Sequence, residues 1–172
     1  MHGIHDSDVR LDHEILILDA YLRAPLSAEN REQAAQSYIG NLLNTLGMEK
    51  LGPMQFHDAA DLRAPGWSFI QPITTSHIGV HYFEKPGRLP HVRIDVYSCK
   101  TVDWRAVVTV TDAHMQFEQW RATFIHRGIE SARKIHDIHG SGAVVTSIDI
   151  VQDDLPALSA TPAEPAIVHA QE

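Results

Sequence analysis

The chain has 172 residues, 44% of them hydrophobic and 21% charged, which is the balance of a globular domain large enough to bury its own core. Its formal net charge of -8 and the lack of any long basic run disfavour a nucleic-acid partner. The single cysteine, Cys99, excludes disulfide frameworks and paired-cysteine motifs, and no apolar run approaches the about 20 residues of a membrane helix, so we expect a soluble cytoplasmic protein without a membrane partner.

The first half of the chain predicts a strand, a helix and a shorter strand. The apolar run His13–Leu22 suits a buried strand. Apolar residues then recur at helical spacing between positions 34 and 46, with Ser27 as the expected N-cap and Gly47 as the C-terminal stop. The shorter strand is expected at 48–57, before a polar loop.

Two β-rich segments, 67–84 and 91–99, are separated by a short loop with two prolines and a glycine. Their simplest pairing is an antiparallel hairpin. A register that begins at Glu84 places Ser76 directly opposite Cys99, and cross-strand Cβ atoms are about 4.5–5.5 Å apart. This register predicts a hydroxyl and a thiol in one small volume.

The rest of the chain predicts, in order, a helix at 103–115, a strand at 118–128, a helix at 129–139 and, after a Gly-Ser-Gly turn, a strand at 143–151. Segment 154–172 is rich in Pro and Ala and is expected to be a disordered tail after a single domain, 1–153. This order of elements predicts an α+β fold, a two-layer α/β sandwich with helices on one face of a mainly antiparallel sheet.

Four histidines stand in two closely spaced pairs. His77 and His81 would share one face of a helix, but four residues of a strand span about 13 Å, which is too far for both to bind one metal ion. His136 and His139 are expected to be exposed to solvent. The sequence therefore predicts no metal site.

Ser76 and His81 lie five positions apart in a β-rich stretch, so an ideal strand directs them to opposite faces. A bulge, a twist or a break at Ser76 is needed to bring them together. From the residues alone two interpretations stay open. Ser76, His81 and Cys99 form a functional cluster, or they are a strand-edge hydroxyl, a half-buried histidine and a core thiol.

Three short motifs occur in an order that resembles the S-adenosylmethionine decarboxylases, in particular the short prokaryotic class whose small subunits form dimers. They are "PGWS", which ends at Ser68, "SHIGVH", from Ser76 to His81, and "DVYSC", which ends at Cys99. The likeness extends over 67–99, with weaker support from the first strand and helix and from a later "HRG". The resemblance implies the family's two-layer α/β sandwich and a homodimer of processed subunits.

The resemblance also implies a cofactor that is made from the chain itself. In the family, a serine attacks the preceding carbonyl and the chain is cut to leave an N-terminal pyruvoyl group, which places the cut here between Thr75 and Ser76. His81 matches the histidine that assists this processing, and Ser68 matches the serine that supports it. Cys99 matches the general acid that returns a proton to the substrate carbon after decarboxylation. The pyruvoyl carbonyl serves as the electron sink for that reaction.

Two departures from the family pattern affect the expected substrate. Thr75 stands where the family commonly has Glu, and "YFEK" replaces Thr-Trp-Pro-Glu after the second histidine, which makes Phe83 and Glu84 the candidate substrate-binding residues. S-adenosylmethionine is the expected substrate, for spermidine synthesis. A basic amino acid, ornithine or arginine, is the alternative.

Other functions stay open at this point. In a non-enzymatic alternative, Thr75 blocks cleavage and the uncut chain binds a ligand or regulates an active relative. Hydrolase functions have less support, because no Gly-x-Ser-x-Gly elbow surrounds Ser76 and only the general abundance of histidines favours a cysteine hydrolase based on Cys99.

Overall fold

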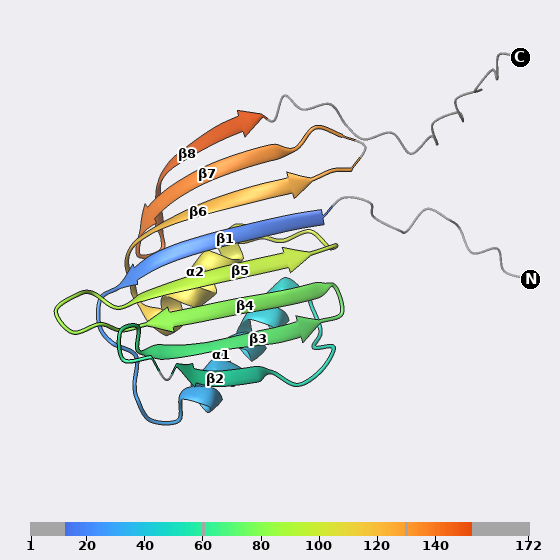
Figure 1. The fold of residues 1–172 in the computed structure, drawn as a ribbon. Helices are drawn as coiled ribbons and strands as arrows, with labels where there is room; N and C mark the ends of the chain where they lie inside the picture. The colour runs from blue at the N-terminus through green and yellow to red at the C-terminus, as the bar shows by residue number, and fades with distance from the viewer. Residues whose placement is uncertain (1–12, 60, 130, 153–172) are drawn as a thin grey trace, which may run out of the picture.

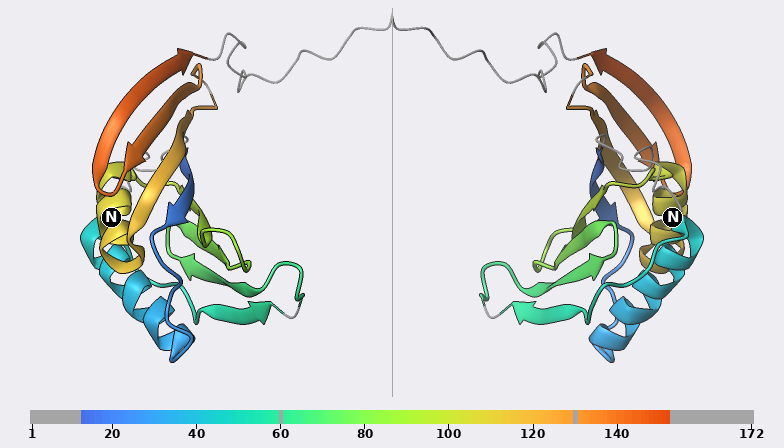
Figure 2. Two further views of the ribbon diagram at one scale, coloured as in Figure 1. Left: turned by 90° about the vertical axis from the view of Figure 1, so that its left-hand side faces the viewer. Right: turned by 90° about the vertical axis from the view of Figure 1, so that its right-hand side faces the viewer.

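The computed structural model describes residues 13–59, 61–129 and 131–152. They form an eight-stranded sheet in which all neighbouring strands are antiparallel, and two helices lie on the same face of this sheet (Figure 1, Figure 2). This arrangement confirms the predicted α+β fold, with helices on one face of an antiparallel sheet. The predicted disordered tail, 154–172, lies outside the described residues.

The strands follow the spatial order β2-β3-β4-β5-β1-β6-β7-β8. Their bounds are β1 His13–Leu22, β2 Gln55–Ala59, β3 Gly66–Ile73, β4 Ser76–Phe83, β5 His91–Ser98, β6 Phe117–Arg127, β7 Lys134–Ser141 and β8 Val144–Gln152. The helices are α1 Arg31–Leu46, between β1 and β2, and α2 Trp104–Met115, between β5 and β6. Neither of these helices is long and apolar enough to cross a membrane.

Alternation along the strands gives the sheet two different faces. In β1, every second residue from Leu16 to Leu22 is buried beneath the helices, whereas Ile17 between them is 38% exposed. The predicted buried strand is therefore buried on one side only. Figure 2 shows no helix or strand of the described chain over the other side, which we call the open face. It carries Ile17 on β1, Ser68 on β3 and His81 on β4.

Helix α1 begins at Arg31 and not directly after Ser27, the predicted N-cap. The Ser27 hydroxyl accepts a hydrogen bond of 3.2 Å from the N–H of Glu29, so it closes a local turn ahead of the helix. Asn30, with a φ of 52°, is the residue that precedes the first helical turn. Gly47, with a φ of 60°, ends the helix as predicted.

Asp103 is the N-cap of α2, in agreement with the predicted helix. Its carboxylate accepts hydrogen bonds from the N–H groups of Arg105, at 3.0 Å, and Ala106, at 3.2 Å. The two helices are joined by a buried contact of 2.9 Å between the hydroxyls of Tyr38 and Thr111. Both helices thus pack on the sheet and on each other.

The predicted helix at 129–139 is wrong, because its second half belongs to strand β7. Ile135 and Ile138 are three positions apart, which is compatible with a helix, but in β7 they face opposite sides of the sheet. Ile138 is fully buried opposite Ala122, and Ile135 pairs with Ile125. Pairing with β6 supplies interstrand hydrogen bonds to this segment that the local pattern does not reveal.

The predicted strand at 48–57 is displaced toward the C-terminus, since β2 begins only at Gln55. Upstream of it, Lys50 forms a single isolated bridge with Ile73 of β3. Pro53 lacks the backbone N–H that a continuous ladder needs, which explains the interruption.

Candidate active site

The peptide bond between Thr75 and Ser76 lies at the tight turn between β3 and β4. Ile73 and Ser76 are the last cross-strand pair, so the loop has only two residues. Ser76 has a φ of 143°, a conformation that serine rarely adopts and that costs about 1–3 kcal/mol. Among the described residues other than glycine, only Asn30 and Gln116 share a positive φ, and both flank helices. Such strain within a described strand is therefore confined to Ser76.

The predicted pairing of Ser76 with Cys99 is wrong by one residue. Ser76 lies opposite Ser98. The backbone N–H of Cys99 donates a hydrogen bond, with an N···O distance of 3.0 Å, to the carbonyl oxygen of Thr75. This is the carbonyl that Ser76 would attack. A fixed donor thus already points at the oxygen on which negative charge would develop.

The shift in register arises at the other end of β4, where Glu84 leaves the ladder. Phe83 is the residue that pairs with His91, and their rings stack with centroids 5.0 Å apart. The Glu84 carboxylate accepts a hydrogen bond of 2.9 Å from the Tyr82 hydroxyl and lies 3.5 Å from the guanidinium of Arg31. Because burial raises the pKa of Tyr82 to about 12, this hydroxyl stays protonated and donates.

Phe83 and Glu84, the predicted substrate-binding residues, are not brought close to Ser76. Seven and eight positions of extended chain separate them from it, which corresponds to about 23–26 Å. Within one chain, they do not belong to the immediate surroundings of the scissile peptide.

Ser68 and His81 form a second polar pair, on the open face. They lie directly opposite each other on β3 and β4, and Ser68 Oγ is 2.7 Å from His81 Nδ1. The His81 ring also stacks on Phe83, with centroids 6.4 Å apart. An imidazole that is held by a hydroxyl and an aromatic ring is oriented for proton transfer.

The structure does not bring His81 close to Ser76. The pairing of β4 with β3 and β5 runs without a bulge between these residues. Five extended positions span about 16 Å, and alternation directs the two side chains to opposite faces. The predicted break that would unite them is absent from β4. The candidate site therefore has two halves, the scissile half of Thr75, Ser76 and Cys99 and the Ser68–His81 pair.

A cluster beside Cys99 was not predicted from the sequence. Tyr97 is at its centre, and its hydroxyl is 2.5 Å from Nδ1 of His13. The ring centroid of Tyr97 is 5.6 Å from the ring centroid of His77 and 5.4 Å from the guanidinium of Arg127. Alternation along β5 could have linked Tyr97 to Cys99, since they share a face. Only the order of the strands brings in His13 and Arg127.

Within the described ranges, no group of three or more histidine, cysteine, aspartate or glutamate side chains gathers to hold a metal ion. His77 and His81 are both on β4, about 13 Å apart. His139 is exposed, as predicted. His136, also predicted to be exposed, is half-buried, because its ring packs 5.9 Å from that of His126 on β6.

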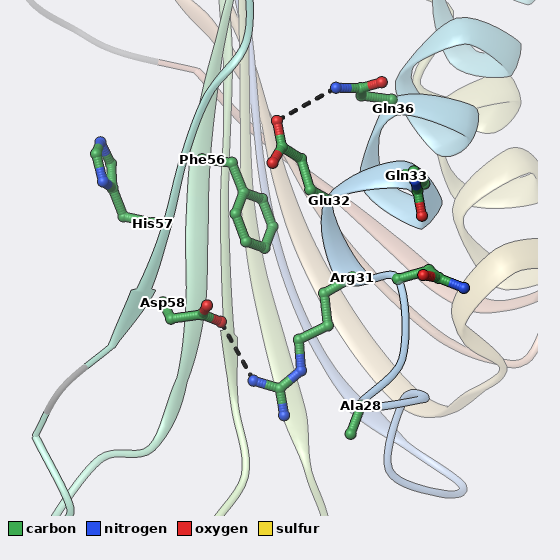
Figure 3. Close-up of a pocket in the computed structure, with 9 residues that line it drawn as sticks. Ala28, Arg31, Glu32, Gln33, Gln36, Phe56, His57 and Asp58 are labelled. Carbon is green, nitrogen blue, oxygen red and sulfur yellow. Dashed lines mark hydrogen bonds and ion pairs between the residues drawn. The ribbon is translucent and has the colours of Figure 1, made fainter.

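A polar pocket between α1 and β2 lies apart from the scissile half of the site (Figure 3). Arg31 of α1 and Asp58 of β2 form an ion pair of 3.2 Å at its wall. His57 points away from α1 in Figure 3. β2 is at the edge of the sheet, two strands from β4, so this pocket lies away from Ser76 within one chain.

The comparison with curated proteins finds no match to the chain. The comparison with protein families matches residues 15–128, well over half of the chain, to the family described as S-adenosylmethionine decarboxylase. The matched region contains the scissile half of the candidate site as well as Ser68 and His81. The chain therefore belongs to the S-adenosylmethionine decarboxylase family.

Proposed function

We propose that the protein is a pyruvoyl-dependent decarboxylase that cuts itself between Thr75 and Ser76 and acts on S-adenosylmethionine for spermidine synthesis. The observation that carries this proposal is the geometry of the scissile peptide. A strained serine follows a carbonyl that already accepts a hydrogen bond from the N–H of Cys99. Thr75 supplies this carbonyl through its backbone, so the replacement of the family's Glu leaves the attacked group in place.

The self-cleavage is a rearrangement followed by an elimination. Ser76 Oγ attacks the Thr75 carbonyl carbon, its proton passes to the Ser76 nitrogen, and the C–N bond breaks to leave an ester. Removal of the Ser76 α-proton then expels the Thr75 carboxylate and leaves a carbon–carbon double bond at residue 76. After tautomerisation to an imine, this residue takes up water and releases ammonia. The N–H of Cys99 stabilises the oxyanion in the first step.

The residues at the turn fit a group that forms by this route. Thr75 Oγ1 is buried beside the scissile bond and has no hydrogen-bond partner within the described residues. In the uncut chain, the turn therefore holds a buried polar atom that is free to form a hydrogen bond with a group produced there. When formed, the pyruvoyl group supplies an electron sink for decarboxylation. The Cys99 thiol, on the open face, returns a proton to the substrate carbon. A free thiol suits the reducing cytoplasm, where we place the reaction.

A homodimer accounts for the separation of the two halves of the site. When two open faces pack against each other in opposite directions, the Ser68–His81 pair of one copy lies over Ser76 of the other. His81 then removes the Ser76 α-proton of the partner chain. The same contact covers Ile17 and Tyr21, which are 38% and 46% exposed in the single chain.

The intact mass of freshly purified protein tests the cleavage. We expect two chains, separated between positions 75 and 76, in place of one chain of 19.2 kDa. The new N-terminus should react with a hydrazine. Ser76→Ala should leave the chain whole, whereas Ser147→Ala, at an exposed position of β8, should be cut normally. An uncut wild-type chain that reacts with no carbonyl reagent would contradict the proposal and favour a regulatory protein.

Release of carbon dioxide from S-adenosylmethionine, ornithine and arginine identifies the substrate. We expect release from S-adenosylmethionine. The second candidate is a basic amino-acid decarboxylase. Within the chain, Phe83 stacks on His91 and Glu84 is held by Arg31, so neither side chain is free in the single chain to bind the adenine-bearing part of S-adenosylmethionine. Release from ornithine or arginine alone would overturn the first choice and leave the self-cleavage unaffected.

A further inference from the structure

Asp95 stands in the middle of β5 on the open face and has no role in the steps proposed above. Its cross-strand neighbour on β4 is Gly79. Within the described part of the chain, its carboxylate forms no hydrogen bond or ion pair. Asp19, on the same face, is held by Arg93 at 3.8 Å and Arg121 at 3.3 Å. Arg93, two positions from Asp95, is therefore already paired with another acid.

Gly79 leaves space in front of the Asp95 carboxylate. A Cβ placed on Gly79 would meet no atom within 4 Å. The adjacent side chains on this face of β4 belong to His77 and His81, so imidazoles bound the space along the strand. A ligand group can approach Asp95 over the Gly79 backbone.

The distance from Ser76 to this space matches the length of an α-amino acid with a cationic side chain. Gly79 lies three positions from Ser76, about 10 Å along an extended strand. In a substrate joined through its amine at residue 76, the side-chain cation is about five to seven bonds away, or about 6–8 Å. The length of the Asp95 side chain accounts for the difference between these two distances. The Cys99 thiol lies on the same face as Asp95. Ser76 in the uncut strand is directed to the opposite face, so the substrate meets both groups only after cleavage, when residue 76 is a chain end that no longer continues the strand.

We propose that Asp95, with the space above Gly79, is the subsite for the positive charge on the substrate side chain. This inference rests on the proposed decarboxylase function. The ligand class is an α-amino acid that carries a sulfonium, ammonium or guanidinium group, since a carboxylate attracts all three. Asp95 thereby selects cationic amino acids over neutral ones of similar length.

The test compares Asp95→Asn with Asp149→Asn, a matched exposed aspartate on β8. The substrate is whichever of S-adenosylmethionine, ornithine and arginine the wild type decarboxylates. We expect Asp95→Asn to be cut normally, with KM for that substrate raised about tenfold or more and kcat within about threefold. Inhibition by the neutral analogues methionine and norvaline should not change. Added salt should raise KM in the wild type but not in Asp95→Asn.

An unchanged KM in Asp95→Asn, or an equal loss of inhibition by the neutral analogues, would overturn the subsite. So would a loss of cleavage, or of the dimer in light scattering, because Asp95 would then be a structural or interface residue. Failure of the proposed function is distinguishable, since the wild-type chain itself would stay uncut. In that case, calorimetric titration of ornithine and S-adenosylmethionine into the uncut chain tests the subsite by itself. Equal binding by the wild type and Asp95→Asn, or no binding by either, would overturn the subsite.

Discussion

At Thr75 and Ser76, the backbone carries most of the candidate chemistry. Ser76 stores conformational strain, which the proposed cleavage of the bond that precedes it would release. The Thr75 carbonyl oxygen accepts a hydrogen bond from the backbone N–H of residue 99. This N–H does not depend on which side chain residue 99 carries. In the proposed function, Cys99 therefore has two separable roles, one through its backbone in the cleavage and one through its thiol in proton transfer.

Cys99→Ala separates these two roles. The variant keeps the N–H that contacts the Thr75 oxygen, so we expect the chain to be cut as in the wild type. Decarboxylation of the substrate should slow by about 100-fold or more, because the general acid is lost. Intact mass measures the first effect and carbon dioxide release the second. An uncut Cys99→Ala chain would show that the thiol acts in the cleavage itself.

Among the secondary-structure elements, the pairing of β4 with β5 decides which atoms meet at the scissile peptide. On the helix side, Ile78 and Val80 of β4 and Ile94 and Val96 of β5 are fully buried. A slip by one residue would move such side chains to the open face. Burial of these four side chains thus fixes the register of β4 and β5, and with it the hydrogen bond between the Cys99 N–H and the Thr75 carbonyl oxygen.

The close packing of β6 and β7 gives a second prediction at this scale. A Cβ on Gly140 would lie 2.2 Å from the Trp120 ring and 2.5 Å from the Val144 carbonyl oxygen. Gly140→Ala should therefore lower the free energy of unfolding by about 1–3 kcal/mol, as measured by urea denaturation. The control is Gly40→Ala in α1, where a Cβ meets no atom within 4 Å, and it should raise this free energy by about 0.4–1 kcal/mol.

Equal stability of Gly140→Ala and the wild type would mean that the Trp120 ring moves aside without cost. That outcome would contradict the packing described at this junction. Trp120 is also fixed by a hydrogen bond of 2.8 Å from its Nε1 to the Gly142 carbonyl oxygen, which opposes such a movement.

For the molecule as a whole, the separation of Ser76 from His81 within one chain is the observation that supports the proposed homodimer. Each chain holds one scissile half and one Ser68–His81 pair, on the same sheet but about 16 Å apart. In the proposed homodimer, two copies related by a twofold axis, which is the symmetry of most homodimers, would form two complete sites from these halves.

Co-expression of Ser76→Ala with His81→Ala tests this arrangement. Each variant alone should remain largely uncut. In the mixture, the His81→Ala chain should be cut, because its Ser76 meets the intact His81 of the Ser76→Ala chain. Intact mass distinguishes the two chains. A mixture in which the His81→Ala chain stays whole would exclude the shared site, and cleavage of His81→Ala alone would assign the proton transfer to another group, such as His77.

Features with local causes could be predicted from the sequence. Gly47 ends α1 as predicted, because glycine adopts a positive φ easily, and the helix expected at 103–115 begins directly after Asp103, whose side chain caps it. The motifs around Ser76 and Cys99 also point to the family, and the region that matches the family contains both. The helix predicted at 129–139 failed because isoleucines three apart fit more than one pattern, and pairing with β6 decided between them.

The sequence by itself determined the fold class, most of the elements and the identity of the family, because periodicity, caps and motifs are properties of neighbouring residues. Only the tertiary structure decided that Cys99 meets Thr75 through its backbone, that Ser76 is strained, and that His81 lies beyond its reach. The physical reason is that register and strand order depend on which buried side chains pack together across the sheet, and residues distant in the chain supply that packing.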